Sequence, residues 1–153
     1  MTKSFEINHL VLQRGIYLND IRKINDETNV YIYDWRIYAP SELKYLNQSA
    51  NHTIEHLLAD YFNNSKEVTK IAIFPYGCLT GFGIALAQNI SPQKLEKIIL
   101  DFIQSVFAQD NFVPGNSLSA CGNPRTLNYL EAIQVLKEVH NDIINGKYHY
   151  VYA

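Results

Sequence analysis

The sequence lacks the features that would tie a protein to a membrane or to nucleic acid. Its 153 residues contain no apolar run near the roughly 20 residues that span a bilayer, and the first six residues lack the apolar core of a signal peptide. The formal net charge is only -2, so there is no strong basic field. We therefore expect a cytoplasmic protein that binds neither nucleic acid nor membrane, and whose partner is a small ligand or another protein chain.

Cysteine is scarce, since Cys78 and Cys121 are the only two. In a reducing compartment such thiols are more often metal ligands, catalytic groups or small buried side chains than partners in a disulfide. Each also neighbours a glycine, so a loop can bring either thiol over a helix face without distorting regular structure. Both are therefore candidates for chemistry.

The chain also lacks internal repeats, linkers and low-complexity tracts. With 47% hydrophobic residues it can bury one substantial core, and we predict a single domain over residues 1–153. The periodicity predicts strands at 5–12, 30–38, 70–75 and 79–87, and helices at 51–64, 91–106 and 128–144. Because strands flank the first helix and two long helices close the chain, we expect an α+β fold in which helices pack on one face of an antiparallel sheet.

Particular residues mark the expected ends of the helices. Asn51 is the expected cap of the first helix, Ser91 followed by Pro92 starts the second, and Gly146 stops the third. The third helix is expected to turn four side chains inward, namely Leu130, Ile133, Leu136 and Ile143. The tyrosine-rich tail, 148–152, fits either a short edge strand or packed aromatic side chains.

Residues 52–56, His-Thr-Ile-Glu-His, carry the strongest chemical signal in the chain. On a helix His52 and His56 project from one face, one turn apart, which suits two ligands of one metal ion. Glu55 lies on nearly the same side, where its carboxylate can move protons at an open metal position. The alternative is an amphipathic helix whose polar face carries these residues by chance.

A catalytic divalent-metal site commonly uses three protein ligands and keeps a position for water or substrate. The pentad supplies two of them. By residue type the candidates for the third are Cys121, Cys78, His9, His140 and the acidic residues. Spacing alone does not choose among them.

Five separate segments, taken in order, resemble the S-ribosylhomocysteine lyase (LuxS) family. They are Ser-Phe-Glu-Ile-Asn-His at 4–9, Tyr-Asp-Trp-Arg-Ile at 33–37, His-Thr-Ile-Glu-His-Leu-Leu-Ala at 52–59, Pro-Tyr-Gly-Cys-Leu-Thr-Gly-Phe at 75–82 and Ala-Cys-Gly-Asn at 120–123. Together they span nearly the whole chain. The resemblance implies a LuxS-like α/β sandwich.

The resemblance also implies roles for the reactive residues. It makes His52, His56 and Cys121 the metal ligands, with ferrous iron native and zinc a common substitute, and it makes Glu55 and Cys78 the acid/base pair. The implied reaction shifts a sugar between aldose and ketose forms and then cleaves a carbon–sulfur bond. The products are homocysteine and the dihydroxypentanedione that becomes a quorum-sensing signal, the autoinducer.

Ser4, His9 and Arg36 are implied to line the sugar pocket, at a site that lies in a homodimer interface. Arg36 stands in an otherwise aromatic strand and calls for a carboxylate or ligand partner. Asp34, two residues earlier, can reach it from the same face of the strand.

The chain departs from the family pattern at Ala72, Asn63, Leu79 and Gly83, and it also lacks a histidine near Leu127. Two of the missing side chains, an acidic residue at 72 and an arginine at 63, are implied to hold the charged homocysteine end of the substrate. An unpaired carboxylate and ammonium bind poorly in a pocket without partner charges. We therefore expect a divergent member whose specificity at the homocysteine end differs.

Two other interpretations fit the same pentad. An inverted-zincin peptidase has the order His-x-x-Glu-His, but it needs a distal ligand, typically acidic, and a large substrate chamber. A non-catalytic paralogue would keep the metal and the fold while binding a sugar or a partner. Substitution of Glu55 and Cys78 separates the second interpretation from catalysis.

Overall fold

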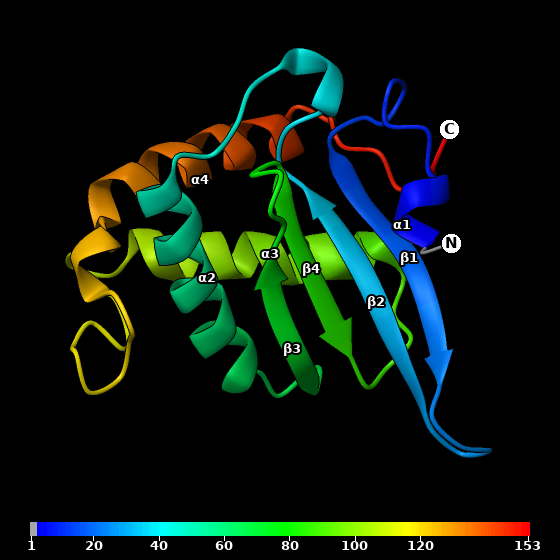
Figure 1. The fold of residues 1–153 in the computed structure, drawn as a ribbon, viewed down its shortest axis with the longest axis horizontal. Helices are drawn as coiled ribbons and strands as arrows, with labels where there is room; N and C mark the ends of the chain where they lie inside the picture. Colours follow the sequence, from blue (N-terminus) through cyan, green and yellow to red (C-terminus); the bar gives the residue numbers. More distant parts are fainter. Residues whose placement is uncertain (1–2) are drawn as a thin grey trace.

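The chain folds into a four-stranded antiparallel sheet whose one face is covered by three long helices (Figure 1). The computed structural model describes residues 3–153. The strands are β1 (Gly15–Lys23), β2 (Asn29–Arg36), β3 (Lys70–Pro75) and β4 (Gly81–Leu86), and they lie in the order β1-β2-β4-β3. The long helices are α2 (Gln48–Asn63), α3 (Pro92–Phe107) and α4 (Tyr129–Ile144). The predicted α+β class is confirmed.

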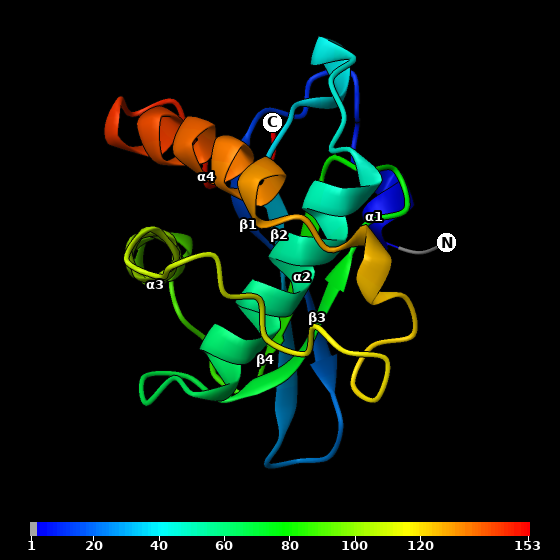
Figure 2. The same cartoon turned by 90° about the vertical axis from the view of Figure 1, so that its left-hand side faces the viewer.

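Three short helices complete the structure: α1 (Lys3–Glu6) and the 3-10 helices η1 (Pro40–Glu42) and η2 (Pro124–Thr126). Figure 2 looks along α3 and shows α4 beside it and α2 in front of the sheet. Within residues 3–153, no helix combines the length and apolar character needed to cross a bilayer.

The long helices begin where a polar side chain caps their free backbone N–H groups. Ser91 accepts a hydrogen bond from Lys94 N, as expected for the second helix, and Asn128 accepts one from Glu131 N at the start of the third. The first long helix starts earlier than predicted. Its cap is Asn47, which is extended and accepts from Ala50 N, whereas Asn51 lies buried inside the helix.

The strand predicted at 5–12 is wrong. The segment contains the end of α1 and a loop, and its apolar residues Phe5 and Leu10 are 74% and 84% exposed. The first strand is β1, in a stretch whose mixed composition hides it, because a bulge between Leu18 and Asp20 breaks the alternation of inward and outward side chains.

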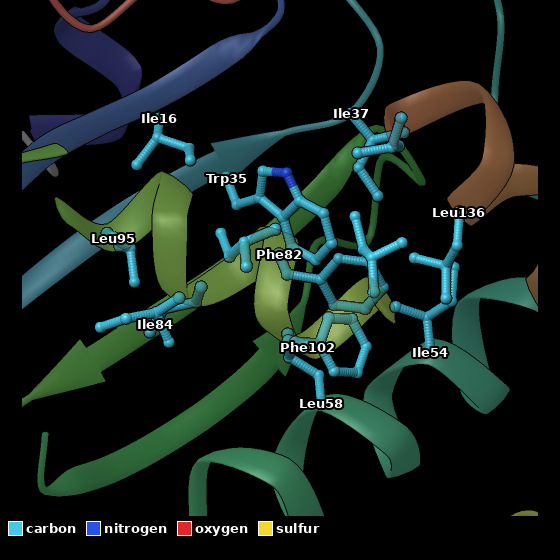
Figure 3. Close-up of a cluster of buried hydrophobic side chains, with 14 of the residues drawn as sticks. Ile16, Trp35, Ile37, Ile54, Leu58, Phe82, Ile84, Leu95, Phe102 and Leu136 are labelled. Atoms are coloured by element: carbon cyan, nitrogen blue, oxygen red, sulfur yellow. The ribbon is translucent and has the colours of Figure 1, made fainter. Parts of the chain in front are cut away.

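The core lies between the sheet and the long helices (Figure 3). Trp35 of β2 contacts Phe82 of β4 and Phe102 of α3, with ring centroids 5.7 and 6.5 Å apart. Leu136 of α4 is buried in the same cluster. Leu130, expected to face inward, is 68% exposed, and the first buried residue of α4 is Ala132.

The C-terminal tail packs beside β1, close to the N-terminal segment (Figure 1). It makes a single parallel bridge between Gly15 and His149 and buries Tyr148, whose hydroxyl accepts a hydrogen bond from Trp35 Nε1 at 3.2 Å. Tyr152 stacks on Tyr17 with ring centroids 4.4 Å apart. Of the two alternatives, the packed aromatic side chains are present, and the edge pairing is limited to this one isolated bridge.

Candidate metal centre and active site

Three side chains that bind metals in proteins converge on the first half of α2. His52 and His56 project from this helix one turn apart, and Cys121 reaches them from the loop between α3 and α4. Their ligand atoms all lie within 4.8 Å of one another, and Cys121 Sγ is 3.4 Å from His52 Nε2. Of the candidates for a third ligand, the structure brings Cys121 to the histidine pair.

Both imidazoles are oriented by partners on the side away from this cluster. His56 Nδ1 lies 2.8 Å from the Pro114 carbonyl, which can only accept, so this nitrogen carries the proton. His52 Nδ1 lies 2.6 Å from Thr126 Oγ1, whose own hydrogen is donated to the Asn123 carbonyl at 3.0 Å, so here too the ring nitrogen donates. Both Nε2 atoms therefore keep a free lone pair for a metal.

The donor set fits a catalytic divalent cation. Burial lowers the pKa of His52, the charge of His56 adds to this effect, and Glu55 opposes it, so the neutral imidazole that binds metals is favoured. Two imidazoles and a thiolate suit Fe²⁺ or Zn²⁺, and three protein ligands leave a position for water or substrate. His52, His56 and Cys121 would hold such an ion.

The loop that carries Cys121 is shaped by a glycine. Gly115 has φ of +72°, in the left-handed region, and a Cβ there would lie 3.2 Å from His56 Nδ1. Backbone hydrogen bonds from Ser117 N to the Gly115 carbonyl and from Cys121 N to the Ser117 carbonyl, at 2.8 and 2.9 Å, then turn the chain back toward α2. The loop closes over the imidazole because position 115 has no side chain.

Glu55 lies beside the metal ligands, half-buried on the same helix. Together with His56 it lines a groove of about 360 Å³ that continues along α2. Its carboxylate makes no hydrogen bond or ion pair with any residue in 3–153. It is thus free to act as a base toward a molecule in the groove.

A second polar cluster surrounds the other candidate catalytic residue, Cys78, at the turn between β3 and β4. Arg36 is buried at the end of β2, where it pairs with Asp34 and donates to Thr80 Oγ1, both at 2.7 Å. Its guanidinium lies 3.8 Å from Cys78 Sγ and 4.7 Å from the ring centre of Tyr76. The predicted pairing of Arg36 with Asp34 is confirmed, and a thiolate at Cys78 would have a cation beside it.

This cluster sits on the face of the sheet opposite the helices, because Asp34 and Arg36 alternate with the core residues of β2. Burial raises the pKa of Asp34, and the adjacent guanidinium acts against that rise. The exposed Cys78 thiol also lies 3.1 Å from Thr80 Oγ1. Cys78 therefore faces solvent with its polar neighbours already fixed.

Ser4 lies near the Arg36 cluster, because it lines a pocket of about 190 Å³ together with Tyr76, whereas His9 does not line that pocket. Ser4 is in α1 and half-buried, and His9 is exposed in the following loop, with its Nδ1 2.8 Å from the Ile7 carbonyl. Within the described part of the chain, no hydrogen bond or ion pair joins either residue to Arg36, Cys78 or the metal ligands.

The departures from the family pattern fall into two groups. Gly83 and Leu79 have local structural partners. A Cβ at Gly83 would lie 2.1 Å from the ring of Phe74, so this glycine makes room for that ring, and Leu79 turns the chain with φ of +59°. Asn63 instead lines the groove that contains Glu55. Ala72 pairs with Ala85 of β4.

Several residues of the site could not be found from the sequence. Thr126 and Pro114, which orient the two imidazoles, lie 74 and 58 residues away from them in the chain. Neither belongs to a pattern that signals metal binding. Metal-bound histidines generally have a hydrogen-bond partner at the ring nitrogen that does not bind the metal, but the sequence does not indicate which residue that partner is.

The fold and the site together define an α+β protein with a candidate three-ligand metal centre of two histidines and one cysteine. A family model described as S-ribosylhomocysteinase (LuxS) matches residues 2–149. The chain therefore belongs to the LuxS family, and the resemblance seen in the sequence is confirmed.

Curated relatives agree with this assignment. The chain is 32% identical over 144 residues to the S-ribosylhomocysteine lyase of Finegoldia magna, covering 94% of this chain and 91% of the relative. It is 28% identical over 145 residues to the enzyme of the same name from Desulfotalea psychrophila, with 94% and 91% covered. A third such lyase, from Phocaeicola vulgatus, is 33% identical over 122 residues, with 78% and 75% covered.

Proposed function

We propose that this protein is a metal-dependent carbon–sulfur lyase that cleaves S-ribosylhomocysteine to homocysteine and dihydroxypentanedione. The observation that carries the proposal is the convergence of His52 Nε2, His56 and the Cys121 thiol beside the free carboxylate of Glu55. The names of the relatives supply the substrate. The products would feed synthesis of an autoinducer used in quorum sensing.

The chemistry requires protons to move between sugar carbons before the thioether breaks. The bound cation, Fe²⁺ or Zn²⁺ in its place, supplies Lewis acidity toward sugar oxygens. Glu55 removes a proton from a sugar carbon and returns it to the next one, and Cys78 does the same from the other cluster. In the last step the carbon–sulfur bond breaks by elimination, and the homocysteine sulfur leaves with a proton.

We place the complete site at a homodimer interface. Ser4 and His9 are proposed to bind the sugar together with Arg36, and within residues 3–153 neither makes a hydrogen bond or ion pair with the metal ligands of its own chain. The apolar side chains around them, Phe5, Leu10 and Val11, are exposed and suit contact with a second copy. Because Cys78 and Cys121 must both stay reduced, we place the enzyme in the cytoplasm.

The peptidase alternative receives no support from the geometry, because the distal ligand brought to the histidines is a thiol and not a carboxylate. A binding paralogue without activity would keep the same metal site. The free Glu55 carboxylate next to the ligands, and a thiol beside a buried arginine, favour catalysis.

The direct test is to incubate the iron-loaded protein with S-ribosylhomocysteine and measure free thiol. We expect stoichiometric release of homocysteine. Glu55→Gln and Cys78→Ala should each lower kcat by about 100-fold or more while metal content is unchanged. Glu27→Gln, in the exposed turn before β2, removes the same charge away from the site and should behave as wild type. Substrate binding without any thiol release would instead identify a binding paralogue.

A further inference from the structure

The groove beside Glu55 extends well beyond the metal ligands. It runs along one side of α2 past Ala59 to Asn63. Lys70 of β3 and the loop through Pro114 also line it. Asn63 lies seven positions after His56, which is about 10 Å of helix. The groove is therefore long enough to hold more than the sugar of a substrate.

Lys70 places a positive charge in this groove. Its Nζ donates to the Ala59 carbonyl at 3.1 Å, which fixes the ammonium over α2. Among residues 3–153 no carboxylate forms an ion pair with it. A lysine ammonium has three hydrogens, so at least two remain for an anionic ligand.

Asp60 places a negative charge in the same groove. Its Oδ1 accepts only a long bond, 3.5 Å, from Asn64 Nδ2, and in the described part of the chain it has no cationic partner. In a projection down the axis of α2, His56 and Asn63 nearly coincide, and Glu55 and Asp60 lie on opposite sides of them. The groove thus carries one unpaired cation and one unpaired anion beyond the metal site.

We propose that Lys70 and Asp60 bind the amino-acid end of the substrate, Lys70 its carboxylate and Asp60 its ammonium. This inference rests on the proposed function. S-ribosylhomocysteine has its reacting sugar at one end and a carboxylate and an ammonium at the other. With the sugar at Glu55 and the metal ligands, the rest of the extended molecule, on the order of 10 Å long, lies along the groove.

Lys70 and Asp60 therefore determine specificity for the amino-acid end of the substrate. They replace the arginine and the acidic side chain of the family pattern, where this chain has Asn63 and Ala72. Asn63 lines the same groove and can donate its amide to the carboxylate. The charges expected to be missing at the homocysteine end are supplied from neighbouring positions on β3 and α2. An amino-acid leaving group, and not a neutral thiol, is the preferred one.

The test is the steady-state kinetics of charge-removing variants of the metal-loaded protein. Lys70→Met and Asp60→Asn should each raise KM for S-ribosylhomocysteine about 10- to 100-fold with little change in kcat, because a charged hydrogen bond distant from the reacting atoms is lost. Lys70→Arg should recover most of the affinity. Lys66→Met and Asp101→Asn change the net charge equally outside this groove and should keep the wild-type KM.

Two truncated substrates assign each charge to its partner. An S-ribosyl thioether without the carboxylate should be a poor substrate for wild type, and Lys70→Met should weaken it no further. A thioether without the ammonium should behave in the same way with Asp60→Asn. Equal loss on all three substrates, or a wild-type KM for Lys70→Met, would overturn the proposal.

A binding measurement separates this inference from the proposed function. Calorimetry with S-ribosylhomocysteine and zinc-loaded Glu55→Gln protein reports affinity without turnover. If Lys70→Met in that background weakens binding while wild type releases no thiol, the charge pair stands and the lyase function fails. If wild type releases thiol but Lys70→Met binds as tightly as its parent, the lyase function stands and the charge pair is wrong.

Discussion

At the scale of single residues, the candidate metal site depends on which ring nitrogen of each histidine carries the proton as much as on the ligand atoms themselves. The Thr126 hydroxyl is committed to the Asn123 carbonyl, so it must accept from His52 Nδ1, and this leaves Nε2 as the acceptor that faces Cys121. The Pro114 carbonyl imposes the same state on His56. A histidine pair with the wrong protonated nitrogen would have to exchange it before binding a metal.

We predict that Thr126→Val weakens metal binding about 10- to 100-fold, because valine has the shape of threonine but cannot accept from His52. Competition with a chromophoric zinc chelator measures the affinity. Thr28→Val, in the exposed turn before β2, is the matched control and should bind zinc as wild type does. Equal affinities of the two variants would show that Thr126 does not orient the ligand.

At the scale of elements, the loop between α3 and α4 is as important to the site as the helix that carries the pentad. Its left-handed glycine, Gly115, allows the backbone to approach His56. Gly146, after α4, has nearly the same φ of +68°, but a Cβ there meets nothing within 4 Å. The two glycines therefore separate the effect of backbone strain from that of contact with the metal ligand.

We predict that Gly115→Ala and Gly146→Ala each destabilise the metal-free protein by about 1–2 kcal/mol, since alanine is strained in this region of φ. Only Gly115→Ala should also weaken zinc binding, because its methyl group pushes on His56. Urea unfolding in chelator and zinc competition measure the two effects. A weaker zinc affinity in Gly146→Ala would mean that strain alone disturbs the site.

The C-terminal tail allows a second prediction at this scale. Tyr148→Phe leaves the buried Trp35 Nε1 without its acceptor and should lower the free energy of unfolding by about 1–3 kcal/mol. Tyr150→Phe removes a hydroxyl that bonds to Glu96 in a half-buried position, where water can replace it, and should lower it less. Urea titrations compare the variants, and equal losses would contradict this ranking.

At the scale of the whole molecule, one chain brings together the metal ligands and, separately, the Arg36 cluster with Ser4 near Tyr76, while His9 is joined to neither by a hydrogen bond or ion pair within residues 3–153. A symmetric dimer in which each N-terminal segment reaches the other chain would complete two sites at once. The exposed apolar side chains of that segment are then buried by the partner.

We predict that an inactive His9→Ala protein and an inactive Glu55→Gln protein regain activity when mixed and allowed to exchange chains. In a mixed dimer, one site combines Glu55 of the first variant with His9 of the second. Glu55→Gln mixed with Cys121→Ser should stay inactive, because both residues belong to one cluster of one chain. Thiol release is measured, and no recovery in the first mixture would show that His9 acts within its own chain.

The parts of the fold that the sequence predicted are those with a regular, uninterrupted pattern. The helix after Ser91 and Pro92 and the strand at 70–75 match α3 and β3 closely, because a cap or a β-rich run is a local signal. The strand predicted at 5–12 is wrong because the apolar side chains of this short alternating segment, such as Phe5 and Leu10, are not buried within the chain. Strand β1 was missed because its bulge shifts the alternation of inward and outward side chains.

The sequence by itself determined that His52, Glu55 and His56 share one side of a helix, because helical periodicity relates neighbours one turn apart wherever the helix lies. Only the tertiary structure decided that Cys121 joins them, that Thr126 and Pro114 orient them, and that Lys70 puts its charge in the groove beyond. Those residues come from loops and strands far along the chain. Their proximity arises from how the helices pack on the sheet, and no local pattern records that packing.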